Sequence, residues 1–397
     1  MQMRPFEIDA RTKFLLLVAF MVTCIASLTA IPVLTPWGAD MQNIHCFQQC
    51  VHGQSPYVMN ARACGDVWAR PFYYPPFLFA FFRWVRPLSL HTTMRIWTTF
   101  VIGAFVGIMV AWAKHITRER SAGERHQIVL FCILLLLQYP FVFALERGNS
   151  DTVNVIFYTL AAFLFVRGRV LLAGAAAGVA AGFKLSPVVA IVVMTGALML
   201  HRSAGRWAWL RFCGGAFGAF LLTLLVFFGE AKRYLFDVLP RYAEIITPAK
   251  EWGHSIPTFV GRGYGGFGLL LGASLMAAWV WAGARALVRG DAAMALAGSL
   301  AVSTYIPRTS FDYNLISTYP LLLLLFLRAQ RTNRWALLAF GVFAIAGDRR
   351  LFALPGAKIF TPHLHLALEL AFLVVAAVVV AHPDEGETAM HAEVSAP

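Results

Sequence analysis

Long apolar segments alternate with short polar segments along most of this chain. An apolar run of about 20 residues forms a helix that crosses the hydrocarbon core of a bilayer, which is roughly 30 Å thick. The pattern therefore predicts an all-α polytopic membrane protein with about 12 transmembrane helices. The expected helices cover residues 12–34, 91–113, 126–144, 152–166, 170–182, 185–200, 207–229, 265–288, 291–306, 313–328, 334–347 and 362–381. We expect residues 1–381 to form one domain and residues 382–397 a flexible cytoplasmic tail.

Composition and charge agree with a membrane protein. Hydrophobic residues make up 59% of the chain and charged residues 13%, against about a quarter charged in soluble domains. In a soluble protein the net charge of +13 would suggest a nucleic-acid partner. Here Lys and Arg lie mainly at the ends of apolar segments, where they mark cytoplasmic loops. The sequence therefore favours membrane lipid, and not nucleic acid, as a partner.

The basic clusters also predict the orientation of the chain. Arginines gather in the stretches 118–125, 202–211 and 328–334, which we place in the cytoplasm together with both termini. Residues 35–91 and 230–264 then lie on the outer face. We expect a multi-pass protein of a bacterial inner membrane, with its polar loops facing the periplasm or the cell exterior.

The first outer loop is long and is expected to be folded. Pro75 and Pro76 stop a regular helix, and the following FLFAFFRWV is too short to cross and too apolar for water, which indicates an interfacial helix. An oxidising compartment would permit one disulfide in this loop. We prefer Cys50 with Cys64, because Cys46 and Cys50 are four residues apart on a probable helix; three reduced thiols are the alternative.

The stretch from 144 to 187 combines two apolar segments with charged residues at helix ends. It carries Glu146, Arg147, Asn149 and Asp151 at one helix end, and Lys184 before a helix break at Pro187. A charged side chain inside hydrocarbon costs roughly 2.5–3.5 kcal/mol on insertion scales, so such groups usually line a polar cavity. Alternatively, the charged residues of the 146–151 turn are ordinary solvated loop residues without a role in a site. Lys184 is harder to explain in this way, because it interrupts an apolar segment.

Asp40 and a set of cations are the candidates for chemistry. Asp40 follows the first apolar segment and is a candidate general base, or alternatively the N-cap of the next helix. The cationic candidates of the outer face, which suit a phosphate, are Arg147, Lys184, His254, Arg262 and Arg308. No phosphate-loop or dinucleotide signature occurs, and His45 and His52 lack metal-ligand spacing. We therefore expect neither a nucleotide nor a metal or other cofactor.

Several motifs occur in an order that resembles a known family. They are Asp40 after the first helix, GQSPY (53–57), FYYPP (72–76), ERGNSD (146–151), FKLSP (183–187), GHSIPTFVGR (253–262) and SFDYNLI (310–316). Over roughly residues 12–330 the chain resembles glycosyltransferase family 87, of the glycosyltransferase-C superfamily. The resemblance implies a glycosyltransferase-C-like bundle that transfers a hexose, typically mannose, with inversion. The donor would be a polyprenyl-phosphate sugar and the acceptor a lipid or a glycan.

The resemblance also implies roles for individual residues. Asp40 would deprotonate the acceptor hydroxyl, and Arg147 and Lys184 would hold the lipid phosphate. His254, where related sequences often have Asn, would contact the donor or the acceptor, and Arg262 is grouped with the phosphate-binding residues. The remaining residues expected to bind substrate are Tyr74, Glu146, Asn149, Asp151, Arg308, Asp312, Tyr313 and Asn314.

A membrane transporter or flippase for a lipid-linked or anionic substrate is the alternative function. Broken helices and intramembrane charges also mark transport sites. Against this alternative, the sequence has no inverted repeat, and its charged motifs are expected on one face of the membrane. The sequence makes no prediction of oligomeric state.

Overall fold

The computed structural model describes residues 38–50, 54–59, 64, 72–116, 122–201, 205, 207–225, 227–241, 255–257, 266–307, 310, 312–332, 334–346 and 361–382. The expected helix over 12–34 lies outside the described residues, and so do residues 383–397 of the expected tail. The same is true of three predicted site residues, His254, Arg262 and Arg308.

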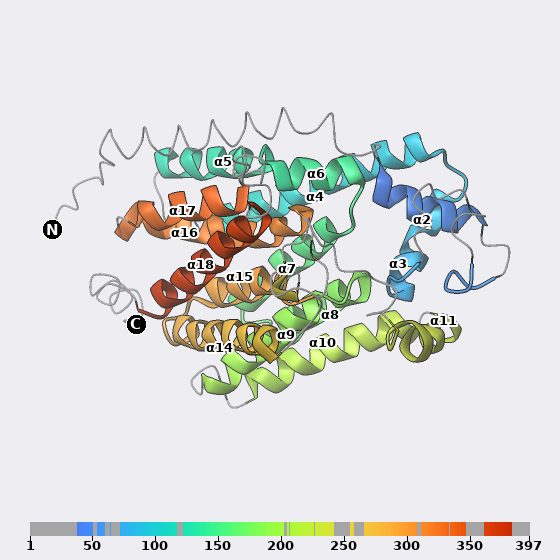
Figure 1. Cartoon of the computed structure of the whole chain (residues 1–397). Helices are drawn as coiled ribbons and strands as arrows, with labels where there is room; N and C mark the ends of the chain where they lie inside the picture. Colours follow the sequence, from blue (N-terminus) through green and yellow to red (C-terminus); the bar gives the residue numbers. More distant parts are fainter. Residues whose placement is uncertain are drawn as a thin grey trace.

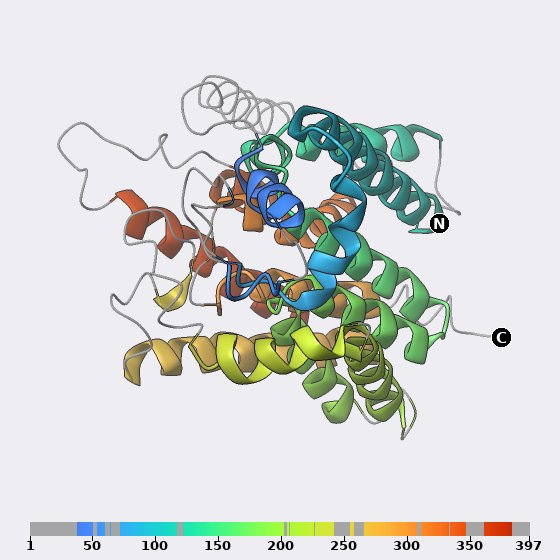
Figure 2. The ribbon, with the colours of Figure 1, turned by 90° about the vertical axis from the view of Figure 1, so that its right-hand side faces the viewer.

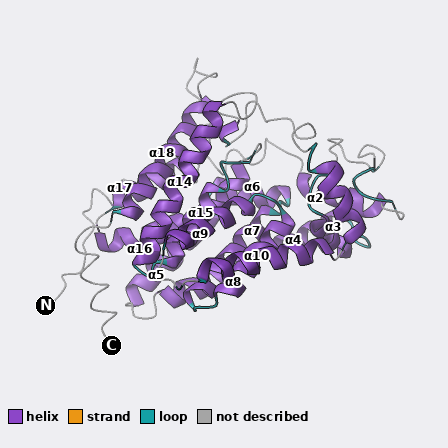
Figure 3. Cartoon of the chain, turned by 90° about the horizontal axis from the view of Figure 1, so that it is seen from below, coloured by secondary structure: helices purple, strands orange, loops and turns teal. Residues whose placement is uncertain are grey.

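Every regular element in these ranges is a helix (Figure 3). The first half of the chain contains α2 (Ala39–Cys50), α3 (Pro76–Phe81), η2 (Phe82–Val85), α4 (Leu90–Ile116), α5 (Ala122–Leu136), α6 (Tyr139–Arg147), α7 (Asp151–Val166), α8 (Val170–Phe183) and α9 (Pro187–Leu200). The second half contains α10 (Ala208–Leu225), α11 (Phe228–Arg233), η4 (Tyr234–Val238), α14 (Gly266–Val288), α15 (Ala292–Val302), η5 (Asp312–Thr318), α16 (Tyr319–Thr332), α17 (Trp335–Ala346) and α18 (Thr361–Ala381). The all-α prediction is confirmed for the described part of the chain.

The prediction of one continuous helix over 126–144 is wrong. α5 ends at Leu136, and α6 begins at Tyr139 after a bend of 53°. Pro140 lies at the start of α6, where its missing N–H is tolerated; inside a continuous helix its ring would clash with a preceding carbonyl. The apolar pattern continues through the bend, so hydropathy alone could not locate it.

Two other expected helices are divided. The helix expected over 207–229 ends at Leu225, and α11 follows from Phe228. The helix expected over 313–328 begins as the 3₁₀-helix η5 and becomes α-helical at Tyr319. Residues 312–314 therefore lie on a tighter turn than the α-helix that the sequence predicts.

The structure contains clear membrane-span candidates, but fewer than the sequence predicts. Among the described residues, three helical segments are long and apolar enough to cross a membrane: α10, α14 and Leu364–Ala381 of α18. The bent pair of Leu130–Leu136 and α6 adds a fourth if it acts as one span. Helices of 14 residues, such as α8 and α9, extend only about 21 Å. The protein is a membrane protein, and the predicted count of about 12 spans is not confirmed.

The helices lie roughly side by side, and α2, α3 and α11 gather at one end of the bundle (Figure 1). Figure 2 looks onto this end, with α2 in blue toward the viewer. α3 and η2 form the helix expected over FLFAFFRWV, and Phe82 packs on Trp97 of α4 with ring centroids 4.9 Å apart. The described part of the first loop is therefore folded against the bundle, as predicted.

Arginines bind the carboxyl end of α18. Arg334 Nη1 donates to the Val379 carbonyl at 3.1 Å and Nη2 to the His382 carbonyl at 3.3 Å, while Arg289 donates to the Val380 carbonyl. The last carbonyls of a helix have no partner within the helix and carry partial negative charge, so cations stabilise them. Arg334, from the basic stretch 328–334 that was used to predict the cytoplasmic side, thus also stabilises the C-terminal end of α18.

Small residues allow α8 to pack closely along α10. A Cβ added at Gly178 would overlap the backbone oxygen of Ala216, and one added at Gly174 would overlap that of Phe212. Small residues at such spacing let helix backbones approach closely in membranes, where van der Waals packing drives association. The contact therefore depends on glycine at these two positions of α8.

We expect Gly178→Ala to lower the melting temperature of the purified protein, because overpacking costs about 1–3 kcal/mol. Gly214→Ala on α10 is the matched control, since an added Cβ there meets nothing within 4 Å. Alanine also favours a helix over glycine by roughly 0.5–1 kcal/mol, so the control should be neutral or stabilising. Thermal unfolding in one detergent compares the two variants. Equal melting temperatures would contradict the close contact.

Candidate active site

Asp40 and Arg147 form a bidentate ion pair. Asp40 lies in the first turn of α2 and Arg147 in the last turn of α6. Arg147 Nη2 lies 2.6 Å from one carboxylate oxygen, and Nε lies 3.0 Å from the other. Beside the pair, the Gly38 N–H donates to the Glu146 carbonyl at 2.7 Å. Two helix ends that are 107 residues apart in sequence are thereby joined.

The turn between α6 and α7 brings a second donor to Asp40. Gly148 ends α6 with φ 66°, and a Cβ there would lie 2.7 Å from Met41 Cβ, so both conformation and space require glycine. The next residue, Asn149, donates from Nδ2 to Asp40 Oδ2 at 2.7 Å. Its Oδ1 accepts the backbone N–H of Asp151 at 2.7 Å. One asparagine therefore orients the Asp40 carboxylate and also stabilises the start of α7.

Lys184 reaches the same turn from the break between α8 and α9. Its backbone is extended, with φ −157° and ψ 144°, and Pro187 begins α9. The Lys184 Nζ donates to Asp151 Oδ2 at 2.7 Å, and Asn154 Nδ2 approaches Asp151 Oδ1 at 3.3 Å. The ammonium group thus meets a carboxylate at the first turn of α7.

The carboxylates of this cluster lie deeper than the cations. The side chains of Asp40 and Asp151 are 5% and 4% exposed, whereas those of Arg147 and Lys184 are 17% and 19% exposed. Buried carboxylates need partners, because an isolated charge in a low-dielectric interior is strongly unfavourable. The cationic groups remain partly accessible and are suited to an anionic ligand. In the described ranges no three His, Cys, Asp or Glu side chains gather as a metal site would require.

The structure brings together several of the predicted site residues. They are Asp40, Arg147, Asn149, Asp151 and Lys184. Glu146 adjoins them through its backbone carbonyl. η5, which carries the predicted residues 312–314, packs against α6 and α7, and Asn314 is buried.

Tyr74 lies in an aromatic cluster of the first loop. Its ring stacks on Tyr73 with centroids 4.7 Å apart, and its carbonyl accepts a hydrogen bond from the Tyr57 hydroxyl at 2.8 Å. Burial, followed by nearby Tyr234 and Glu230, raises the pKa of Tyr57 well above its ordinary value, so Tyr57 keeps the proton that it donates. These contacts give Tyr74 a role in folding the loop, and its contact with substrate stays a prediction.

Two further contacts hold the first loop in place. A disulfide joins Cys50 to Cys64, the pairing preferred from the sequence, with Cα atoms 5.4 Å apart. This separation lies within the usual range for a disulfide. Between the two cysteines, Ser55 Oγ donates to the Glu230 carboxylate on α11. The loop is therefore held both to itself and to the α10–α11 end of the bundle.

Asn154, His365 and Glu369 are buried polar residues that the sequence pattern did not single out. Asn154 follows Asp151 by three residues, a helical spacing that predicts neighbours on one face. Glu369 interrupts the apolar segment 362–381, which is the same sign that marked Lys184. Both signals were present in the sequence.

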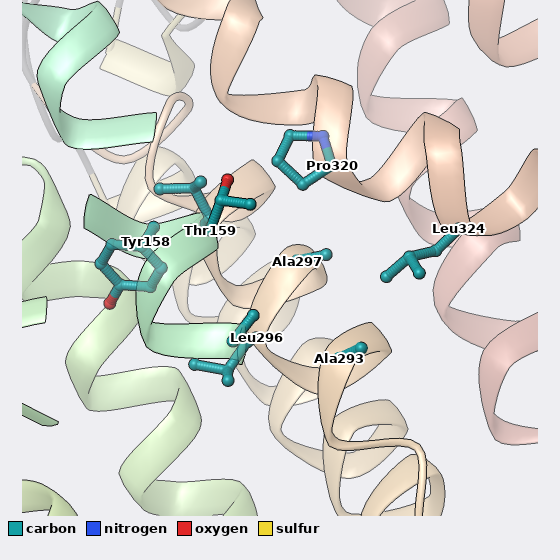
Figure 4. A pocket seen from close by; sticks show the side chains of 9 residues that line it. Tyr158, Thr159, Ala293, Leu296, Ala297, Pro320 and Leu324 are labelled. Atoms are coloured by element: carbon teal, nitrogen blue, oxygen red, sulfur yellow. The ribbon is translucent and has the colours of Figure 1, made fainter. Parts of the chain in front are cut away.

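An apolar cavity lies between α7, α15 and α16 (Figure 4). Tyr158 and Thr159 line it from α7, Leu296 and Ala297 from α15, and Leu324 from α16. None of the residues of the charged cluster lines it. No cationic side chain lines it either, so the cavity is separate from the candidate site.

Comparison with known proteins identifies the family. The model of glycosyltransferase family 87 matches residues 72–307, which is more than half of the 397 residues. Similar relatives include the polyprenol-phosphate-mannose-dependent alpha-(1-2)-phosphatidylinositol pentamannoside mannosyltransferases of Mycolicibacterium smegmatis and Mycobacterium tuberculosis. Their identities to this chain are 27% over 291 residues and 25% over 290 residues. The alignments cover 69% of this chain in both cases, and 67% and 63% of the two relatives. This chain belongs to glycosyltransferase family 87, and it is a glycosyltransferase.

Proposed function

We propose that this protein is an inverting hexosyltransferase that uses a polyprenyl-phosphate sugar, with mannose as the expected hexose. The acceptor would be a lipid or a glycan on the outer face of the bacterial inner membrane. The observation that carries the proposal is the cluster of Asp40 and Asp151 with Arg147 and Lys184, which combines buried carboxylates with accessible cations. Mannosyltransferase relatives support the donor class, and family membership favours a transferase over a transporter or flippase.

The proposed reaction is a single displacement at the anomeric carbon. The acceptor oxygen forms the new bond, its proton passes to Asp40, and the bond to the phosphate oxygen breaks. The departing polyprenyl phosphate gains about one negative charge, which Arg147 and Lys184 would stabilise in a low-dielectric site. Inversion needs one base and a supported leaving group, on opposite faces of the sugar ring.

We expect donor binding to change how readily Asp40, the proposed base, accepts a proton. Without substrate, Arg147 is paired with Asp40 and Lys184 with Asp151. A phosphate that draws the guanidinium away would remove a positive charge that stabilises the Asp40 carboxylate, so Asp40 would accept the proton of the acceptor hydroxyl more readily. Asn149 would keep the carboxylate oriented. In this mechanism, donor binding makes Asp40 a stronger base.

Asp40→Asn should abolish transfer while donor binding persists. The measurement is transfer of label from polyprenyl-phosphate mannose to a total lipid and glycan extract by the purified protein. Loss of general-base catalysis lowers the rate by about 10²–10⁴. Asp291→Asn is the matched control, because Asp291 also pairs with an arginine, Arg328, at 2.9 Å, and asparagine preserves its cap on α15. Near-wild-type turnover in Asp40→Asn would remove Asp40 as the base.

Lys184→Met should weaken donor binding about 10- to 150-fold, because hydrogen bonds to charged groups contribute roughly 1.5–3 kcal/mol. The substitution also leaves Asp151 without its cation, which destabilises a buried carboxylate. The double variant Lys184→Met/Asp151→Asn separates the two effects. Its melting temperature should recover while its donor affinity, measured by titration with labelled donor, stays low. Wild-type affinity in the double variant would exclude Lys184 from phosphate binding.

The proposed outer location predicts an oxidised Cys50–Cys64 pair in cells. Mass tagging of thiols in protein trapped rapidly from intact cells should reveal two further thiols after reduction, because disulfides persist in oxidising compartments. In Cys50→Ser/Cys64→Ser protein this gain should disappear. An unchanged thiol count in the wild-type protein would argue against both the disulfide and the outer location of this loop.

A further inference from the structure

The amide oxygen of Asn154 is a buried polar atom beside the candidate site. Asn154 lies on α7, three residues after Asp151, and is 3% exposed. Its Oδ1 is enclosed and has no hydrogen-bond partner among the residues that the structure describes. Buried polar atoms of native proteins are nearly always paired, because an enclosed acceptor without a donor is unfavourable. This oxygen is therefore suited to a ligand that brings its own donor.

The neighbouring carboxylate determines which end of the Asn154 amide is left over. Asn154 Nδ2 lies 3.3 Å from Asp151 Oδ1, and Asp151 is also paired with Lys184. An ionised carboxylate only accepts hydrogen bonds, so the NH₂ end of the amide must face it and the oxygen must point elsewhere. The group that is left over is therefore an acceptor, and its ligand must supply a hydrogen-bond donor.

Two other residues of α7 show the direction in which the Asn154 side chain extends. Residues 151, 154 and 158 follow one another at intervals of three and four, which places them on one face of the helix. Asp151 accepts from Lys184 Nζ at 2.7 Å, and the Tyr158 hydroxyl donates to the Pro187 carbonyl at 3.3 Å. Asn154 lies between these two contacts, so it faces the break between α8 and α9.

The chemistry beside Lys184 indicates which ligand group fits. Lys184 and Asn154 donate to the two oxygens of one carboxylate, that of Asp151. In the proposed function Lys184 holds the phosphate of the donor, and the transferred sugar is bonded directly to that phosphate. The ionised phosphate has no hydrogen to donate, so it cannot satisfy the Asn154 oxygen, whereas a hydroxyl can. The ligand group that fits is thus a hydroxyl of the donor sugar.

We propose that Asn154 is a specificity-determining residue, whose Oδ1 accepts a hydrogen bond from one hydroxyl of the transferred sugar. This inference rests on the proposed function. The bond from Nδ2 to Asp151 keeps the amide oriented. A site built to pair with a hydroxyl rejects an analogue that lacks it, because the buried acceptor is then left without a partner. The amide would therefore select among sugars by the presence and configuration of one hydroxyl.

Deoxy analogues of the donor test this proposal. The full-length protein in nanodiscs is assayed with labelled polyprenyl-phosphate mannose and with the analogues that each lack one hydroxyl of the sugar. Both kcat/KM and donor affinity are measured. The wild-type protein should lose about 5- to 150-fold in kcat/KM on one analogue, the effect of a buried acceptor without a donor. Asn154→Leu should lose a similar factor on mannose itself and show no further loss on that analogue.

Thr159→Val is the matched control. Thr159 is a buried polar residue of the same helix, but its hydroxyl donates to the Val155 carbonyl and its side chain lines the apolar cavity. This variant should keep the wild-type preference among the donors. If Asn154→Leu does not fold, Asn154→Ser takes its place, because the shorter side chain stays polar but does not reach as far. Asn154→Ser should show the same loss of preference.

An equal loss on every donor in the Asn154 variants would show that Asn154 acts only through Asp151, and would overturn the proposal. Equal kcat/KM values of the wild-type protein for all donors would overturn it as well. A wild-type protein that transfers no sugar would instead contradict the proposed function. The donor affinities would then still show whether Asn154 discriminates between mannose and its deoxy analogues.

Discussion

The candidate site depends on one constraint: each of its two buried carboxylates needs a cationic partner. Asp40 and Asp151 are almost fully enclosed, and in a low-dielectric interior each needs a cation and further hydrogen bonds. Arg147 comes from the end of α6, and Lys184 comes from the break between α8 and α9. The start of α2 therefore meets the α6–α7 turn and the break between α8 and α9 at one place, where each carboxylate has a cation as its partner.

Helix ends are suited to this task. A helix presents unsatisfied N–H groups at its start and carbonyls at its end, so carboxylates are favoured in the first turn and cations in the last. Asp40 and Asp151 lie in the first turns of α2 and α7, and Arg147 lies in the last turn of α6. The extended residue Lys184 adds a cation at a point where the chain is no longer helical. The helix breaks therefore supply the charged side chains and also the backbone partial charges of opposite sign that stabilise them.

Much of this arrangement could be predicted from the sequence, and the limits have physical causes. Apolar runs located long helices such as α4, α14 and α18, and the cost of charge in hydrocarbon singled out Lys184. Hydropathy could not show the bend before Pro140, because the residues on both sides are apolar. The partner of Asp40 is 107 residues away, so its identity depends on how the helices pack and not on local spacing. A single carboxylate such as Glu369 was easily overlooked within a long apolar segment.

The ion pairs of the candidate site differ in one property from the His365–Glu369 pair of α18. In the Asp40–Arg147 and Asp151–Lys184 pairs the cations are 17% and 19% exposed, so a substrate phosphate can compete for them. In the His365–Glu369 pair both side chains are at most 1% exposed, so a ligand would have to displace packed helices. An accessible pair can exchange partners during a reaction, whereas an enclosed pair maintains one geometry. The first arrangement suits chemistry that repeats with each turnover, and the second suits the fixed framework that such chemistry requires.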